Sequence, residues 1–325
     1  MSDLPDKITV VIPNYNGLSE LDGCVKSVLQ ELPLSSVIVV DDGSTDNSVS
    51  YIKSAFPGIR VISYEENRGF AHAVNAGIQE VKTPYVFLLN NDARVMNGAM
   101  QTLCDTMEEL GEEVFSVGAR MLTLTKPRKI DNSGDLYCAL GWAFTPGKDR
   151  PAGWYRRRAW VTSVCAGAGL YRTDLLRGLG GFDEAHFCYL EDVDLGIRAR
   201  LRGYRNCYEP AATVLHAGSA TSGSRHNAFK VRLTAGNNLY LLYKNFPLPL
   251  LLVWLPLLAA GVIIKGVFFA RKGLAEAYLT GLREGLHKIA RGGDRRVRFE
   301  TDRERKALLT LAAEMYLNLI RRIVG

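Results

Sequence analysis

Short apolar segments alternate with helix-like segments through the first ninety residues, and this alternation restricts the fold more than any other feature of the sequence. Four apolar runs are predicted as strands, namely Ile8–Ile12, Val37–Val40, Ile59–Ser63 and Tyr85–Leu89. Helical patterns separate them at residues 22–32, 46–56 and 69–82. Strands that are apolar throughout are covered on both faces, which indicates a mainly parallel sheet with helices on each side. The sequence therefore predicts a Rossmann-like α/β fold.

Polar residues follow three of these predicted strands directly. The segments are 13–16 (Pro-Asn-Tyr-Asn), 41–46 (Asp-Asp-Gly-Ser-Thr-Asp) and 90–92 (Asn-Asn-Asp). Ligands of open α/β sheets bind beyond the carboxyl ends of the strands, so the three segments together predict a binding site at that edge. Each segment alone also fits a simple turn, because Asn, Asp, Gly and Ser are turn formers.

Four side chains are candidates for chemistry. Asp92 ends a buried strand, where a carboxylate suits Mg²⁺ or Mn²⁺. Glu191 and Asp192 open a helix predicted over residues 191–202. A carboxylate at a helix N-terminus stays ionised and can act as a general base, although helix capping explains such a pair equally well. His216 suits a metal ligand, a phosphate contact or a purely structural role.

The rest of the middle segment has weaker patterns. Val114–Met121 is predicted as a strand, residues 126–158 as loops, and Val161–Leu170 as a strand whose small residues allow close backbone approach. Asp194 lies one helical turn before Arg198, so we expect these two side chains to form an ion pair.

Several enzyme classes are disfavoured by missing motifs. No three-glycine dinucleotide fingerprint follows the first strand, and no GxxxxGK[ST] loop is present, which argues against a dehydrogenase and a P-loop ATPase. A nucleotidyltransferase needs basic residues in an early glycine-containing loop, and residues 14–17 contain none. The six cysteines are scattered without a CxxC motif, which favours reduced thiols in a cytoplasmic compartment.

Seven segments, taken in order, carry a resemblance to a known family. They are Val11-Ile-Pro-Asn-Tyr-Asn-Gly17, Val39-Val-Asp-Asp-Gly-Ser-Thr-Asp46, Asn67-Arg-Gly-Phe-Ala-His-Ala-Val-Asn-Ala-Gly77, Leu88-Leu-Asn-Asn-Asp92, Gly180-Gly-Phe-Asp-Glu184, Tyr189-Leu-Glu-Asp-Val-Asp-Leu195 and Val214-Leu-His216. The chain resembles family two of the inverting, nucleotide-sugar-dependent glycosyltransferases with the GT-A fold, in which an acceptor subdomain adjoins the Rossmann-like sheet. Within that family it is most similar to the bacterial rhamnosyltransferase-like branch, which builds cell-surface polysaccharides on a polyprenyl diphosphate carrier.

The resemblance implies a role for each matching residue. Asp92 would bind Mg²⁺ or Mn²⁺, with His216 as the second protein ligand. The family's DxD-like motif has only this one carboxylate here. Asp192 would be the general base, and Glu191 beside it would orient the acceptor or assist the leaving diphosphate. Asp42, with Asp41, would recognise a uracil or thymine ring, and the remaining donor-binding residues would be Pro13, Tyr15, Asn67, Gly69, Phe70, Asn90 and Asn91.

The implied activity is an inverting sugar transfer. The donor would be a dTDP- or UDP-sugar, with rhamnose as the leading candidate, and the acceptor a polyprenyl-diphosphate-linked glycan or another cell-surface polysaccharide. The alternative is a non-catalytic sugar-nucleotide-binding or scaffold protein of a polysaccharide assembly complex. Retention of Asp92, Asp192 and His216 disfavours this alternative, and a test for donor hydrolysis would separate the two.

An apolar stretch at residues 246–264 contains no charged residue, and a basic segment follows it. Between Lys265 and Lys306 there are twelve Lys or Arg and six Asp or Glu, which accounts for the whole net charge of +6. A basic surplus beside an apolar stretch indicates an anionic membrane surface and disfavours nucleic acid as a partner. Because the domain before the stretch and the basic residues after it both belong on the cytoplasmic side, we expect an in-plane or re-entrant element.

The predicted organisation has three parts. Residues 1–235 form the catalytic domain, with a nucleotide-binding half up to about residue 120 and an acceptor half from 121 to 235. Residues 236–292 form membrane-associated helices, in which Leu274, Tyr278, Leu282, Leu286 and Ile289 make an interfacial stripe unless they pack on the catalytic domain. A last helix follows within residues 293–325 and packs on the domain or on a second copy in a homo-oligomer. The expected location is the cytoplasmic face of the bacterial inner membrane, as a peripheral or monotopic protein.

Overall fold

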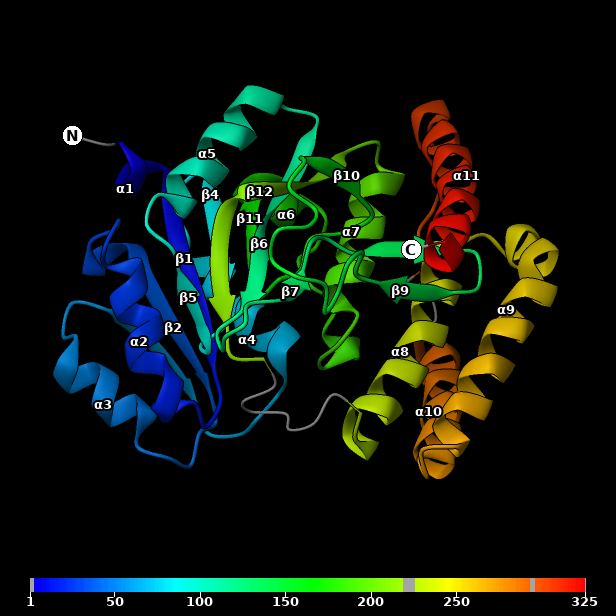
Figure 1. The fold of residues 1–325 in the computed structure, drawn as a ribbon, viewed down its shortest axis with the longest axis horizontal. Coiled ribbons are helices and arrows are strands. Elements are labelled where there is room, and N and C mark those ends of the chain that lie inside the picture. Colours follow the sequence, from blue (N-terminus) through cyan, green and yellow to red (C-terminus); the bar gives the residue numbers. More distant parts are fainter. Residues whose placement is uncertain (1–2, 219–225, 293–295, 325) are drawn as a thin grey trace.

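A large mixed sheet, covered on both faces by helices, forms the body of the protein, and four C-terminal helices lie along one side of it (Figure 1). These features come from a computed structural model that describes residues 3–218, 226–292 and 296–324.

The first half of the sheet is parallel, as the sequence predicts. Its strands lie in the sheet in the order β4-β1-β2-β3. Along the chain, a helix joins each of these strands to the following one, and β4 is followed by a short strand and then by α5. The bounds are α1 (Leu4–Lys7), β1 (Ile8–Asn14), α2 (Leu18–Val28), η1 (Leu34–Ser36), β2 (Val37–Asp42), α3 (Ser48–Ala55), β3 (Arg60–Tyr64), α4 (Phe70–Glu80), β4 (Tyr85–Leu89), β5 (Ala93–Val95) and α5 (Ala99–Leu110).

The apolar strands are continuous because both of their faces are buried. In β1, Val10 and Ile12 join the hydrophobic core under α2, α3 and α5, whereas Val11 joins the core under α4. Alternate residues of a strand point to opposite faces, so the central residues Val10, Val11 and Ile12 are all apolar in a sheet that is covered on both faces.

The second half of the sheet contains both parallel and antiparallel strand pairs. Strand β11 is antiparallel to both β4 and β6, and β12 is parallel to β6, so β4, β6 and β12 all run the same way. The elements are β6 (Val114–Thr123), β7 (Ile130–Asn132), the hairpin β8 (Leu136–Cys138) and β9 (Trp142–Phe144), β10 (Ala159–Val161), β11 (Ala168–Arg172), α6 (Thr173–Gly178), η2 (Glu184–His186), α7 (Glu191–Leu201) and β12 (Arg205–His216).

The prediction of one strand over residues 161–170 is wrong. The chain leaves the sheet after β10 and re-enters it at β11, and residues 165–168 form a turn in which Ala168 N donates to Cys165 O. The small residues do serve close approach, because a Cβ atom on Gly167 would lie 2.8 Å from Asn90 Nδ2. The small residues therefore indicate a tight turn that packs against the end of β4, and they do not lie in the interior of one strand.

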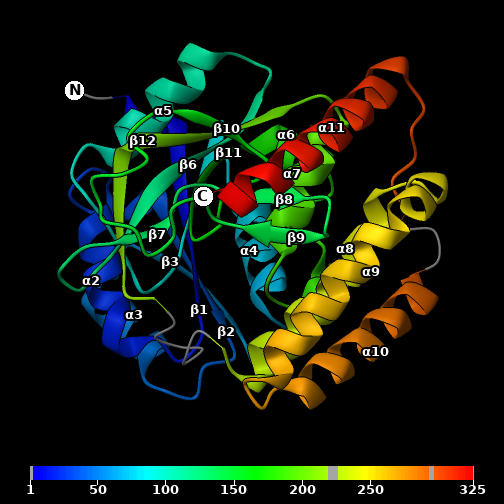
Figure 2. The same ribbon diagram turned by 45° about the vertical axis from the view of Figure 1, so that its right-hand side comes forward.

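The C-terminal helices are α8 (Ala228–Asn245), α9 (Leu248–Ala270), α10 (Ala275–Gly292) and α11 (Asp302–Val324). Figure 2 shows α8, α9 and α10 side by side, with α11 crossing above the β8–β9 hairpin. Leu241, Trp254 and Met315 from these helices share one hydrophobic core with Tyr137 of β8 and Ile197 of α7. The last helix therefore packs on β8 and α7 of the same chain.

Helices α8 and α10 touch backbone to backbone. A Cβ atom on Gly281 would lie 2.1 Å from Arg232 O, and one on Gly236 would lie 2.6 Å from Gly281 O. Glycine at these positions is required for the close approach. The prediction of a lipid-facing stripe on α10 is wrong for Tyr278, which is buried and packs with Val231 of α8, and Leu282 packs beside it.

Helix α9 is continuous through Pro256, and it is long and apolar enough to cross a membrane. One side of it packs against the rest of the protein, through Trp254 and through Gly261, whose carbonyl accepts from Trp142 Nε1 at 3.3 Å. The other side is exposed, and it carries the apolar residues Leu248, Leu252, Val253, Leu255, Ile263, Ile264, Val267 and Phe268. We call this set the α9 apolar face.

Candidate active site

The polar segments of the sequence meet at one edge of the sheet. Strands β1, β2, β4 and β12 run in the same direction and end at Asn14, Asp42, Leu89 and His216. The segments that follow them therefore lie beside one another at the carboxyl edge (Figure 1).

Asn14 ties the ends of three strands together. Its amide donates to Asp41 Oδ2 at 2.8 Å, and its carbonyl oxygen accepts from Asn91 Nδ2 at 2.8 Å. Asp41 also accepts from Ser44 N at 3.0 Å, so its buried carboxylate fixes the loop after β2. Pro13 and Tyr15 flank Asn14, and the Tyr15 ring is exposed.

Asp42 fixes the entrance to α4. Its carboxylate accepts from Arg68 N at 3.0 Å and from Gly69 N at 2.8 Å. Gly69 has a φ of 97°, and a Cβ atom there would lie 2.6 Å from Phe187 O, so only glycine fits. Asn67 contributes by accepting from Gly69 N. The backbone donors before α4 are thus already used by a carboxylate of this chain.

Asp92 and His216 are in direct contact. The strand pairing that places His216 opposite Ala93 brings its Nε2 to 3.0 Å from Asp92 Oδ1. The other ring nitrogen, Nδ1, lies 2.7 Å from Asp131 Oδ2. The side-chain nitrogen of Asn90 lies 3.5 Å from the same Nε2.

The protonation of His216 follows from these two carboxylates. Burial disfavours the imidazolium, but the hydrogen bonds to Asp131 and Asp92 outweigh it and raise the pKa of His216 to about 9. Burial likewise opposes ionisation of Asp131, yet the His216 hydrogen bond and the charge of Lys148 hold the pKa of Asp131 below its usual range. A positive charge at this point is therefore stabilised by two fixed carboxylates.

Asp192 approaches the same edge from α7. Its Oδ2 accepts from Ala166 N at 3.3 Å, and the neighbouring Gly167 accepts from Asn90 N at 3.0 Å. The turn at residues 165–168 therefore joins Asp192 to the segment that carries Asp92.

The acidic pair on α7 is less ionised than a helix N-terminus alone suggests. Burial, and then the charge of Asp135, raise the pKa of Asp192 to about 7, against the hydrogen bonds from Ala166 N and Val193 N. Burial and the charge of Asp192 raise the pKa of Glu191 well above its usual value. Glu191 Oε2 is buried, and no hydrogen-bond partner reaches it within the part of the chain that the structure describes.

The loop that leads into α7 is held in an unusual backbone conformation. Phe187, Tyr189 and Leu190 all have φ between 61° and 70°, a region that side chains other than glycine rarely adopt. Asn237 of α8 is fully buried and donates from Nδ2 to the carbonyls of His186, Cys188 and Tyr189. Strain of this kind persists only where the surroundings enforce it, and it is typical of functional loops.

A cluster of buried ion pairs links α7 to α8. Asp194 is fully buried, and its carboxylate accepts from Arg198 Nε at 2.8 Å, as predicted, and from Lys244 Nζ at 2.8 Å. Lys244 also bonds Asp183 Oδ2 at 2.7 Å. Asp183, His186 and Asp194 have the spacing of a metal site, with ligand atoms within 4.8 Å of one another. The positive charges of Lys244 and Arg198 together balance the two carboxylates, so we assign this cluster a structural role.

Sequence reasoning missed Asp131, Asp135 and Asn237. The first two lie in the segment predicted as loops, where the run Asp131-Asn-Ser-Gly-Asp135 resembles the polar segment after β2 in its Asp, Gly and Ser content. That likeness is the available signal. Nothing in the helical pattern around Asn237 distinguishes it from an ordinary surface position.

Comparisons with known proteins show which family this chain resembles. Residues 9–180 match the family model described as "Glycosyl transferase family 2". The chain is 26% identical over 246 residues to N-acetylglucosaminyl-diphospho-decaprenol L-rhamnosyltransferase of Mycobacterium tuberculosis. That alignment covers 68% of this chain and 79% of the mycobacterial protein. The chain is 36% identical over 119 residues to glycosyltransferase GlyG of Streptococcus pneumoniae, covering 35% of this chain and 38% of GlyG.

Solved structures of low sequence identity share the fold. GalNAc-T7, solved with UDP, GalNAc and Mn²⁺, aligns with a TM-score of 0.59 and 16% identity over 88% of this chain and 56% of its own. The mannosyltransferase PcManGT of Pyrobaculum calidifontis, in complex with GDP-Man and Mn²⁺, aligns with a TM-score of 0.51 and 19% identity over 89% of this chain and 86% of its own. The predicted GT-A fold is thereby confirmed, and because the family model covers more than half of the sequence, the chain belongs to glycosyl transferase family 2.

Proposed function

We propose that this protein is a metal-dependent, inverting glycosyltransferase that moves a sugar from a dTDP- or UDP-sugar to a polyprenyl-diphosphate-linked glycan at the cytoplasmic face of a bacterial inner membrane. The observation that carries the proposal is the contact of Asp92 with His216 beside the turn that holds Asp192. The similarity to a mycobacterial rhamnosyltransferase supports rhamnose as the first donor sugar to test.

The residues at Asp92 suit a divalent cation. Asp92 Oδ1 and His216 Nε2 lie 3.0 Å apart, and Asp131 on Nδ1 fixes the ring, as carboxylates do for metal-binding histidines. One carboxylate and one imidazole favour Mn²⁺ over Mg²⁺, which binds almost entirely through oxygen. A bound cation would offset the charge that grows on the leaving diphosphate.

The protein's own residues would perform the proton transfer. Asp192 would accept the proton of the acceptor hydroxyl as that oxygen attacks the anomeric carbon from the face opposite the diphosphate, and inversion follows from this single displacement. With its pKa raised, Glu191 would remain protonated and donate a hydrogen bond to the acceptor. Asp42 and Asn91 would shape the nucleotide side of the site through the loops they fix.

The metal and donor assignments predict a thermal-shift result. Nucleotide sugars are expected to raise the melting temperature of the wild-type protein, and to raise it further with Mn²⁺, because a ligand at about 100 times its Kd adds about 2.7 kcal/mol to stability. Asp92→Asn should lose the Mn²⁺-dependent part of the shift. Asp174→Asn, an exposed acid on α6, is the control and should retain it.

Two outcomes would count against this function. A panel of nucleotide sugars that gives no shift with either metal would contradict donor binding. Donor binding without hydrolysis or transfer to any lipid-linked acceptor would favour the non-catalytic alternative.

The α9 apolar face predicts membrane binding. A helix that packs along one side against its own domain cannot cross a bilayer alone, so we propose that α9 lies in the plane of the membrane with this face inserted. Val253→Asp with Ile263→Asp should reduce co-sedimentation with anionic vesicles at low salt by about tenfold or more, because both side chains are exposed on this face. The control, Met96→Asp with Lys53→Ala, makes the same charge change on the catalytic half and should bind as wild type.

A further inference from the structure

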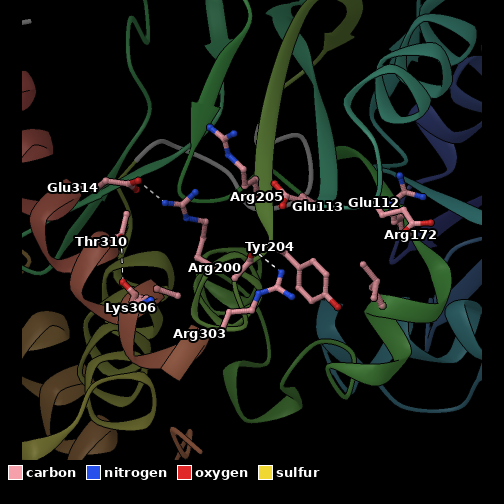
Figure 3. A pocket seen from close by; sticks show the side chains of 13 residues that line it. Glu112, Glu113, Arg172, Arg200, Tyr204, Arg205, Arg303, Lys306, Thr310 and Glu314 are labelled. Atoms are coloured by element: carbon pink, nitrogen blue, oxygen red, sulfur yellow. Dashed lines mark hydrogen bonds and ion pairs between the residues drawn. The ribbon is translucent and has the colours of Figure 1, made fainter. Parts of the chain in front are cut away.

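A basic cavity lies away from the candidate active site, and nothing described above uses it. It has a volume of about 820 Å³ and opens between α11, the end of α7 and the first residues of β12 (Figure 3). Strand β12 begins at this cavity with Arg205 and ends at the active site with His216. The paired interval of β6, from Val114 to Thr123, spans roughly 30 Å at about 3.3 Å per residue. The two sites are therefore separate.

Basic side chains dominate the lining of this cavity. Five of them reach it from four different elements or loops, namely Arg172, Arg200, Arg205, Arg303 and Lys306. The acidic side chains in the lining are Glu112, Glu113 and Glu314, which leaves an excess of two positive charges. A cavity of this size is in the range of ordinary small-molecule sites.

Several of these basic side chains are not paired with a carboxylate among the described residues. Arg172 donates to three backbone carbonyls, and Arg200 bonds Glu314. Arg205 instead stacks on the Trp160 ring, and Arg303 donates to Gly203 O and lies over the Tyr204 ring. Among the described contacts, no carboxylate pairs with Arg205, Arg303 or Lys306.

Arg200 supplies a second, independent observation. Its side chain is only 9% exposed, and its Nε has no hydrogen-bond partner among the described residues. A buried guanidinium N–H without an acceptor is costly, and the negative charge of an anion in the cavity that Arg200 lines would offset part of that cost. Arginine is also the side chain best suited to oxyanions, because its planar donors match phosphate geometry.

We propose that this cavity binds a phosphate-bearing anion of two negative charges, such as a diphosphate or a phosphate monoester. The oxyanion accepts from Arg303 and Lys306, the charge of the Arg200 guanidinium attracts it from the cavity wall, and the Tyr204 ring offers an apolar surface to the group that the phosphate carries. The anion bridges α7 and α11. A soluble phosphate ester and a lipid headgroup share this chemistry.

The test uses the full-length protein in EDTA, so that the Asp92 and His216 site cannot contribute through a metal. Inorganic pyrophosphate is titrated by calorimetry against wild type, Arg303→Ala with Lys306→Ala, and a charge-matched control, Lys53→Ala with Lys82→Ala. Wild type and control are expected to bind alike, and the cavity variant about tenfold more weakly or not at all, since two charged hydrogen-bond donors are lost. Melting temperatures without ligand establish that each variant is folded, and Lys306→Glu replaces the double variant if it is not.

A second arm separates the two sources of phosphate. Phosphatidylcholine vesicles with and without phosphatidic acid are compared for binding of the same three proteins. Pyrophosphate binding lost in the cavity variant supports a soluble ligand, and a phosphatidic-acid effect lost only in that variant supports a headgroup. Equal pyrophosphate binding by all three proteins would overturn the proposal. It would also be overturned if no protein binds pyrophosphate and the cavity variant binds vesicles as wild type does.

Discussion

Asp192→Asn is expected to leave donor binding intact and to lower the rate of sugar transfer by about two to four orders of magnitude, the usual contribution of a general base. The amide keeps the size of the side chain and accepts from Ala166 N, so the turn beside Asp92 should persist. It cannot take a proton from the acceptor hydroxyl. The rate is measured as release of nucleoside diphosphate with donor and acceptor present, and donor affinity by thermal shift.

Asp174→Asn is the matched control and should transfer sugar as wild type does. Near-wild-type turnover of Asp192→Asn would remove Asp192 from the role of base. A parallel loss of donor binding would indicate instead that the substitution disturbs the nucleotide site.

The pH dependence of the wild-type rate gives a second readout of the same residue. Burial and the charge of Asp135 raise the pKa of Asp192 to about 7, and a base works only when deprotonated. The rate should therefore fall about tenfold per pH unit below pH 7 and level off above it. The residual activity of Asp192→Asn should lack this dependence.

Asp194→Asn is expected to destabilise the protein by about 3 kcal/mol, since breaking a buried ion pair leaves an uncompensated charge. Asp194 is fully buried, and Arg198 and Lys244 both donate to its Oδ2 at 2.8 Å. Urea unfolding measures the change. Asp302→Asn removes an exposed carboxylate that pairs with Arg305, and as the control it should change stability by less than about 0.5 kcal/mol.

Acid should reproduce part of this loss in the wild-type protein. Burial opposes ionisation of Asp194, but the charges of Lys244 and Arg198 outweigh it and hold its pKa well below the usual range. An acid whose pKa is lowered by folding stabilises the protein above its unfolded pKa, about 3.9, and this contribution is lost as the pH falls further. Wild type should therefore lose more stability below pH 4 than Asp194→Asn does, and equal losses would contradict the ion-pair argument.

The parallel half of the fold could be predicted because its signals are local. Strands β1, β2 and β4 each contain a buried apolar run, and the predicted bounds of β4 match the structure. The turn at residues 165–168 was hidden, because small residues suit a strand interior and a close turn equally well. What decides between them is the side chain of Asn90, far away in the sequence.

Site residues that directly follow predicted strands could be predicted from the sequence. Site residues whose role is to orient another side chain or a loop could not. Asp92 and His216 were named from their place at strand ends, and the structure brings them into contact. Asp131 and Asn237 act by orienting a ring and a loop, and such contacts depend on tertiary packing that no periodicity records. The raised pKa of Asp192 likewise reflects burial against Asp135, which a helix position alone does not reveal.

The short junction between α8 and α9 would fix the distance between the candidate active site and the membrane. Only Phe246 and Pro247 separate the two helices, and the Phe246 ring packs against Trp254. Through Asn237, α8 also grips the loop that precedes Asp192. Because no flexible linker separates α8 from α9, Asp192 would lie at a fixed distance from a bilayer on which α9 rests. Acceptors would then be sorted by how far their reactive hydroxyl projects from its lipid anchor, and a series differing only in spacer length would measure that distance.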